Sequence, residues 1–164
     1  MNKLIFPLRT QRAHQRGAVA VELAIVATVM LLIVAGAIGF GRAYWYADAL
    51  TKATRDGARL LSTWEIKETG EGTLSGVADA QSIVMSTANA ANLSPQLTAN
   101  NVVVKCAYSA FTFLDCSDTK GRPVNIRVSI TGFSLNLSEW FPFVGGQAFG
   151  SVGLSPATTM RYMN

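Results

Sequence analysis

The sequence is poor in charged residues, which make up 15% of its 164 positions, whereas 49% of the residues are hydrophobic. The mean hydropathy is +0.27. Soluble domains usually contain roughly 25% charged residues. The length suits one domain of modest size, and a membrane segment within it would explain the apolar bias.

Acidic residues are absent from the first sixteen positions, which contain Lys3, Arg9, Arg12 and Arg16. From Ala18 onward, ten basic residues are balanced by ten acidic ones. The net charge of +4 therefore arises in the short N-terminal segment alone. The rest of the chain shows no basic stripe that could follow a phosphate backbone, so nucleic acid is not an expected partner.

Histidine and cysteine are scarce. His14 lies in the basic segment, and the two cysteines are Cys106 and Cys116. Because a structural zinc site needs about four nitrogen or sulfur ligands, no metal is expected. The cysteines are interpreted as a disulfide pair, which requires an oxidising compartment, and two buried free thiols are the alternative.

The common catalytic motifs are also absent: the sequence contains no GxSxG, GxxxxGK[ST], HExxH or GxGxxG. After Gly17 no histidine follows that could activate a cysteine. Asp115 and Asp118 come closest to a carboxylate pair, but they stand beside the turn sequence DTKGR and are interpreted as turn residues. We therefore expect neither catalysis nor a cofactor.

Residues 23–41, LAIVATVMLLIVAGAIGFG, form a long uncharged run between Glu22 and Arg42. As a helix the run spans roughly 28 Å, about the thickness of a bilayer's hydrocarbon core. It predicts a transmembrane helix, with a buried core helix as the alternative. The basic segment before it and the mixed charges after it predict a cytoplasmic N-terminus and a C-terminal part outside, in a bacterial periplasm.

A cleaved signal peptide is a further alternative, because residues 35–37 (AGA) resemble a small-residue cleavage site. The apolar run is longer than a typical h-region, however, and Glu22 is unusual at its start. Apolar residues also continue at steps of three and four, which predicts one helix over about 18–62. Its expected packing face comprises Ala43, Ala47, Leu50, Thr54, Ala58 and Leu61. The residues expected at the membrane interface are Tyr44, Trp45 and Tyr46.

The remainder of the chain predicts a small outer domain. Residues 64–76 read as a loop, and a second helix is expected over about 77–92 with Ser75 as its N-cap. Strands are expected within 101–109 and 123–133. The alternating apolar residues of the latter range, which would be buried, are Val124, Ile126, Val128 and Ile130.

A weaker third strand is expected within 149–160. We therefore predict an α+β fold, in which a long N-terminal transmembrane and amphipathic helix packs on a small C-terminal antiparallel sheet.

The stretch RGAVAVELAIVATVMLLIVAGAIGFGRA resembles the processing site of type IV prepilins. In that superfamily a basic leader ends in glycine, a prepilin peptidase cuts after it, and glutamate stands at the fifth mature position. The resemblance implies cleavage between Gly17 and Ala18, with Glu22 as the fifth mature residue. The longer pattern through YWYADALTKATRDGAR resembles TadE-like pseudopilins of tight-adherence (Flp) pilus systems, as does EWFPFVGG before ATTMRY.

The resemblance implies a pilin-like minor pilin or pseudopilin needed for the biogenesis of Flp pili. It divides the chain into a leader (1–17), a helix (18–62) and a periplasmic domain (63–164). The implied partners are the prepilin peptidase, other pilins or pseudopilins and the inner-membrane pilus platform. The implied location is the bacterial inner membrane, or the pilus itself. An uncleaved single-pass protein with a ligand-binding or partner-binding periplasmic domain is the alternative.

Glu22 has a physical reason to need a partner. A charge in a membrane helix costs about 3 kcal/mol or more near the centre and less near the end. Cleavage would create an ammonium group at Ala18, one helical turn away, and the resemblance implies that a neighbouring subunit's amine can take this role. A side chain that reaches the membrane surface is the alternative. The glycines that would let helices approach closely are Gly36, Gly39 and Gly41.

Overall fold

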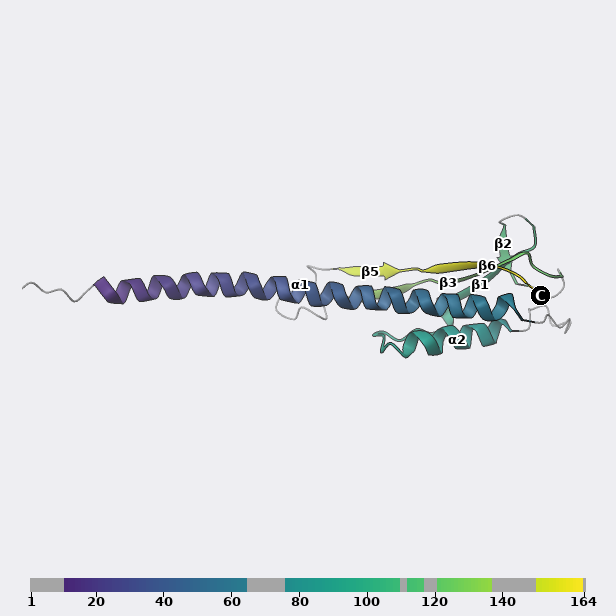
Figure 1. Cartoon of the computed structure of the whole chain (residues 1–164), viewed down its shortest axis with the longest axis horizontal. Helices are drawn as coiled ribbons and strands as arrows, with labels where there is room; N and C mark the ends of the chain where they lie inside the picture. Colours follow the sequence, from purple (N-terminus) through teal and green to yellow (C-terminus); the bar gives the residue numbers. More distant parts are fainter. Residues whose placement is uncertain (1–10, 65–75, 110–111, 117–120, 137–149, 164) are drawn as a thin grey trace, which may run out of the picture. The chain divides into compact units, whose positions relative to one another are not determined.

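The structure, a computed structural model, describes residues 11–64, 76–109, 112–116, 121–136 and 150–163, with side chains from residue 17 onward (Figure 1). The chain divides into two compact units, Met1–Phe40 and Gly41–Asn164, the second of which is called the outer unit below. The boundaries expected at residues 17 and 62 concern processing and topology, and they stay predictions.

The long helix is confirmed, and it is longer than expected. Helix α1 comprises Gln11–Ser62 and contains no proline, so no residue in it removes a backbone donor. Its last turn tightens, because the backbone N–H groups of Thr63 and Trp64 donate to the carbonyls of Leu60 and Leu61. Met163 N donates to the carbonyl of Ser62 at 2.9 Å, so the C-terminal strand segment satisfies one of the helix's terminal carbonyls.

The second helix, α2, comprises Val77–Asn89. Its N-cap is Gly76 rather than Ser75, which lies outside the described residues. Gly76 has φ +95, a conformation that favours glycine. A Cβ added there would stand 2.8 Å from the ring of Trp64, so both backbone angle and space require glycine.

A four-stranded antiparallel sheet forms the other layer of the outer unit, in the order β2-β1-β3-β6. Its strands are β1 (Val102–Ala107), β2 (Phe113–Asp115), β3 (Asn125–Ile130) and β6 (Ala157–Arg161). A separate two-stranded sheet pairs β4 (Phe133–Asn136) with β5 (Ser151–Leu154). The α+β fold with a small antiparallel sheet is therefore confirmed.

Two details of the strand prediction are wrong. The expected third strand within 149–160 is two strands in two different sheets, separated at Ser155 and Pro156. Val124 is 45% exposed, because β3 begins one residue later. Val124 N instead donates to the carbonyl of Ala107 at 2.7 Å, just outside the regular ladder.

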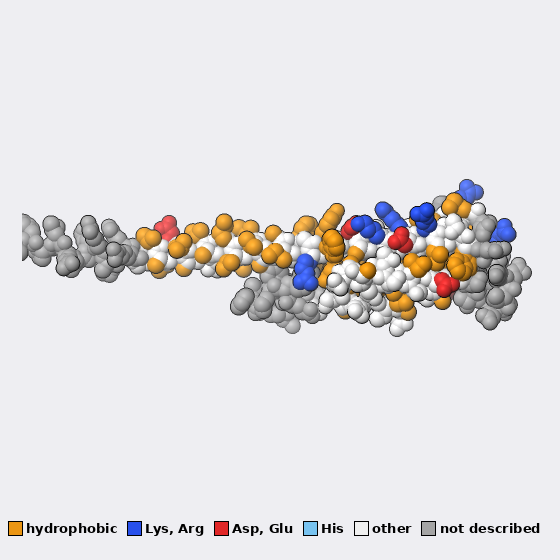
Figure 2. Space-filling model, turned by 60° about the horizontal axis from the view of Figure 1, so that its bottom comes forward, with side chains coloured by type: hydrophobic (Ala, Val, Ile, Leu, Met, Phe, Trp, Pro, Cys, Tyr) orange, Lys and Arg blue, Asp and Glu red, His pale blue; other side chains and the backbone are white. Residues whose placement is uncertain are grey.

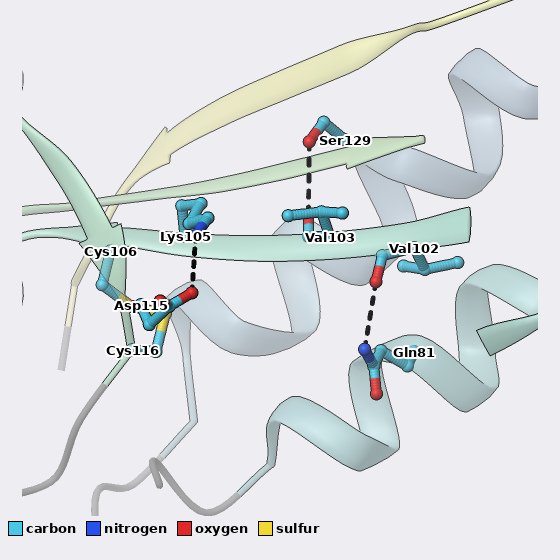
Figure 3. Close-up of polar contacts among 8 residues, drawn as sticks. All are labelled: Gln81, Val102, Val103, Lys105, Cys106, Asp115, Cys116 and Ser129. Carbon is cyan, nitrogen blue, oxygen red and sulfur yellow. Dashed lines mark hydrogen bonds and ion pairs between the residues drawn. A yellow bond between two sulfur atoms is a disulfide. The ribbon is translucent and has the colours of Figure 1, made fainter. Parts of the chain in front are cut away.

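The core lies where α1 meets α2 and the inner face of the sheet. The fully buried side chains include Leu50, Leu61, Val84, Ile126, Val128 and Ile130. Gln81 Nε2 of α2 donates to the carbonyl of Val102 at 3.0 Å and ties that helix to β1 (Figure 3). The Sγ atoms of Cys106 and Cys116 lie 2.03 Å apart, at disulfide distance, and join β1 to the end of β2.

One buried polar pair crosses this core. Thr54 has no exposed surface, and its Oγ1 donates to the carbonyl of Thr51 at 2.9 Å. Because a hydroxyl has one hydrogen, Thr158 donates to Thr54 Oγ1 across the 2.9 Å contact between them. The bond connects α1 to β6 without leaving a buried hydroxyl unsatisfied.

Gly57 is the point of closest approach between the elements. Figure 1 shows α2 on one side of the C-terminal part of α1 and strands β3 and β6 on the other. A Cβ on Gly57 would lie 2.5 Å from Val84 Cγ2, 3.4 Å from the carbonyl oxygen of Ala80 and 3.7 Å from Val128 Cγ1. The two helices can pack at this distance only because position 57 has no side chain.

We expect Gly57→Ala to lower the free energy of unfolding of the outer unit by about 1–3 kcal/mol, the usual cost of overpacking a core. Val84 is buried and β-branched, so it cannot rotate away freely. Urea unfolding of the full chain in detergent, followed by tryptophan fluorescence, measures the change.

The matched control is Gly41→Ala in the same helix, where an added Cβ meets no atom within 4 Å. There the higher helix propensity of alanine should raise stability, by up to about 1 kcal/mol. Combining Gly57→Ala with Val84→Ala should cost less than the sum of the two single changes. Equal stabilisation by both alanines would show that the contact at Gly57 does not limit the packing.

Candidate functional site

The residues of the implied processing site lie together near the start of α1. Gly17, Ala18 and Glu22 are all exposed, and a Cβ added to Gly17 meets no atom within 4 Å. Ala18 and Glu22 are four residues apart in one helix, so their side chains lie on the same face. Residues 1–10 of the basic leader lie outside the described residues, as do the side chains of Arg12 and Arg16.

The apolar run after Glu22 is not part of a protein core. Figure 2 shows orange side chains all along this part of α1. The most apolar stretch of the helix Gly17–Ser62 has a hydropathy of 2.7 and is 0% buried, and side chains such as Leu31 and Phe40 are at least 70% exposed. This N-terminal helix is long and apolar enough to span a membrane, and the structure does not support the alternative of a buried core helix.

The polar groups of this run are satisfied inside the helix. Its backbone forms α-helical hydrogen bonds throughout, as any segment surrounded by hydrocarbon must. Thr28 Oγ1 donates to the carbonyl of Ala24 at 2.8 Å, which hides its hydroxyl in the usual way. Glu22 is the one charged residue between Gly17 and Gly41, and a helix cannot satisfy a carboxylate internally.

Of the three aromatic residues expected at the membrane interface, two are exposed and one is buried. Tyr44 and Trp45 are 70% and 62% exposed, whereas Tyr46 is 3% exposed. The Tyr46 hydroxyl accepts a bond from Arg42 Nη2 and donates to the carbonyl of Asn92, both at 3.2 Å. Tyr46 lies four residues before Leu50, so helical spacing places it on the packing face. The same spacing in the sequence could have revealed this role.

The other residues of the packing face behave as expected. Leu50, Thr54, Ala58 and Leu61 are buried, and Ala43 and Ala47 are half-buried. Ala53 and Gly57 are also buried and extend this face, although the sequence analysis did not include them; both lie at steps of three or four residues from Leu50 and Leu61, so the same spacing could have indicated them.

The two carboxylates considered as a pair do not form one in the described part of the chain. Asp115 binds Lys105 across β1 and β2 at 2.6 Å, and Asp118 lies outside the described residues (Figure 3). Among the described residues there is no group of three or more His, Cys, Asp or Glu side chains that could hold a metal ion. The stretch EWFPFVGG also lies outside the described residues.

Comparison with known proteins matches the helix and not the outer strands. A family described as TadE-like protein matches residues 17–59, about a quarter of the chain. No curated protein and no solved structure matches the chain. The matched segment begins at Gly17, includes Glu22 and the apolar run, and ends just after Gly57. The chain is therefore TadE-like over residues 17–59, consistent with a TadE-like protein of the tight-adherence pilus system.

Proposed function

We propose that the protein is a minor pilin or pseudopilin required for building tight-adherence (Flp) pili, and that a prepilin peptidase cuts it after Gly17. A role in assembly of this pilus system has the support of the TadE-like match. The observation that carries the finer proposal is the position of the match. It starts at the glycine after which a prepilin would be cut, and Glu22 is then the fifth residue of the product.

The local structure favours Gly17 as a cleavage point. The residue is exposed, and among the described residues no atom lies within 4 Å of the position that a Cβ would take. Glycine inside a helix destabilises it by roughly 0.5–1 kcal/mol relative to alanine, so the helix opens more easily here than it would with alanine at this position. An extended, accessible peptide bond is what a protease needs. In this proposal the chain is a substrate and an assembly factor, not an enzyme.

Cleavage would give the Glu22 carboxylate a partner. The new ammonium group at Ala18 lies one turn away on the same helix face. Neutralisation within one chain or with the amine of a neighbouring subunit would remove the cost of an unpaired carboxylate at the membrane. Because only a neighbour's amine joins two chains, this contact would set the register between helices during assembly.

The proposed topology puts the leader in the cytoplasm and the outer unit in the periplasm. Four basic residues precede Gly17, and positive charges favour the cytoplasmic side. A periplasmic outer unit would lie in an oxidising compartment, in agreement with the disulfide distance between Cys106 and Cys116. The second candidate is an uncleaved single-pass protein whose outer unit binds a periplasmic partner, and the same span and topology favour it.

The two candidates differ in their response to Gly17→Val. We expect this change to abolish cleavage and leave the full-length chain in the membrane, because valine is bulkier and β-branched at the residue before the cut. Intact mass spectrometry of protein from native membranes checks this, together with a count of surface pili. A product of the unchanged chain that starts at Met1, or after residue 37, would overturn the processing proposal.

Gly36→Val is the matched control, since an added Cβ meets no atom within 4 Å at either glycine. Cleavage of this variant should equal that of the unchanged chain. If Gly17→Val also leaves the mass and the pili unchanged, the uncleaved single-pass protein is the better reading.

A separate prediction concerns Glu22. We expect Glu22→Gln to be cleaved normally but to reduce surface pili about fivefold or more, which corresponds to the loss of about 1 kcal/mol from a charge pair in the membrane. Quantitative immunoblotting of sheared pili, with intact mass to verify cleavage, measures both effects.

Thr28→Val is its control, because it removes a polar group that bonds only within its own helix. This variant should assemble pili normally. Normal piliation with Glu22→Gln would show that the carboxylate reaches the membrane surface without a pairing role, and it would leave the cleavage proposal standing.

A further inference from the structure

The four-stranded sheet of the outer unit ends in two edge strands, β2 and β6. Among the described residues, β2 pairs only with β1 and β6 pairs only with β3. Edge strands present unpaired N–H and C=O groups, and they readily accept a strand from another chain. We propose that copies of this protein associate edge to edge, with β6 of one copy adding antiparallel to β2 of the next.

The hydrogen-bond ladder defines which groups of β6 are available. Ile130 N donates to the carbonyl of Pro156 at 3.0 Å, and Tyr162 N donates to the carbonyl of Val124 at 3.0 Å. Even-numbered residues of the last strand therefore face β3, because the direction alternates along an antiparallel ladder. The residues whose N–H and C=O groups point away from the sheet are Ala157, Thr159 and Arg161.

The same alternation applies at the opposite edge. Thr131 N donates to the carbonyl of Asn101 at 2.8 Å. The backbone N–H and C=O groups of the odd-numbered residues of β1 therefore point toward β3, and those of its even-numbered residues point toward β2. Leu114 pairs with Cys106 of β1, so its backbone groups bond within the sheet. Phe113 and Asp115 direct their backbone groups outward. Each edge thus offers donors and acceptors at alternate residues, as a partner strand requires.

β6 carries little of the protection that edge strands usually have. Its sequence is ATTMR, with no proline or lysine and with its single charge at the end. Natural edges are commonly protected by inward charges, proline or bulges. Two neighbouring threonines, which favour extended structure, make the middle of this strand suitable for pairing.

The direction of the strands favours copies that share one orientation. All pairs in the sheet are antiparallel, and there are four strands, so β2 and β6 run in opposite directions. A neighbour shifted sideways without rotation therefore presents its β2 antiparallel to β6. Copies anchored in one membrane through the same helix share one direction across that membrane. This step rests on the anchoring part of the proposed function, and it does not depend on cleavage.

The side chains at the two edges are complementary. With Asp115 of one copy opposite Thr159 of the next, Phe113 stands opposite Arg161, and Asp115 is a diagonal neighbour of that arginine. Of the three side chains of β2, those of Phe113 and Asp115 lie on the outer face of the sheet, and Leu114 points to the opposite face. Within one chain Arg127 already lies over the Phe113 ring at 5.5 Å, which shows that this ring accepts a guanidinium group.

Charge and rigidity add to this match. Asp115 is 90% exposed beyond its bond to Lys105, so its carboxylate can accept from a second cation (Figure 3). Cys116, the next residue, lies at disulfide distance from Cys106 of β1 and holds the end of β2 in place. A strand that is already ordered loses less entropy on binding.

The test uses two differently tagged full-length copies in one membrane, with Arg161→Cys in the first and Phe113→Cys in the second. The sequence has two cysteines, which are paired, so each variant adds one free thiol. Oxidation should give a mixed dimer only when both variants are present. The control replaces the first variant by Ser134→Cys, an exposed position on β4, and should give no dimer.

A disulfide dimer of Arg161→Cys with itself would show a twofold β6–β6 contact and overturn the proposed arrangement. Capture of β6 by a different subunit, or no dimer from correctly folded variants, would overturn it too. Intact mass of the same samples reports cleavage after Gly17, so failure of the edge contact and failure of the processing proposal give separate signals.

Hydrogen exchange of the unsubstituted chain gives a second test that does not depend on the variants. In nanodiscs with several copies, the outward N–H of Thr159 should exchange about tenfold or more slowly than in nanodiscs with one copy, as expected for a new backbone hydrogen bond. The N–H of Met160 faces β3 and should be protected in both. Equal exchange at Thr159 would overturn the proposal.

Discussion

The outer unit depends on how closely the backbone of α1 can approach α2 and β3. At Gly57 the space for a Cβ is already occupied by Val84 Cγ2, and Val128 Cγ1 lies 3.7 Å from the same point. This approach brings Leu50 and Leu61, one to two turns away on α1, into a core from which solvent is fully excluded. Larger residues at position 57 would separate the layers, and dispersion contacts weaken steeply with such gaps.

Helix α1 is continuous, but the side chains of its N-terminal part are mostly exposed, whereas many in its C-terminal part are buried in the outer unit. From Leu23 to Val34 the helix is apolar nearly all round and exposed, which suits lipid or other helices. After Gly41 the buried residues recur at steps of three and four and face the sheet. The TadE-like match covers both parts and ends at residue 59, beside the glycine contact. The match therefore covers the apolar part of the helix and most of its packing surface.

Sequence reasoning succeeded where the signal is local. The apolar run, the 3.6-residue period of α1 and the alternation of β3 all depend on neighbours within a few positions. The prediction of the strands failed where the pairing depends on residues that are distant in the sequence. Pro156 lies where the chain passes from one sheet to the other, and this change depends on the partner strands β4 and β3, which are distant in the sequence. For the proposed processing site, the sequence shows only the spacing between Gly17 and Glu22. The reason why Glu22 needs a partner comes from the cost of its charge in a membrane.

That chemistry centres on Glu22. A carboxylate in this position cannot be satisfied by its own helix, whose backbone groups are already paired, and the apolar side chains after it offer no donor. Of the groups that a cut after Gly17 would create, the ammonium at Ala18 is the one that carries the opposite charge. Because an unpaired charge costs more in hydrocarbon than in water, under the proposed processing a subunit whose amine reached Glu22 would gain more than one out of register. In that proposal, a single acidic residue in an apolar helix would set the register between neighbouring helices.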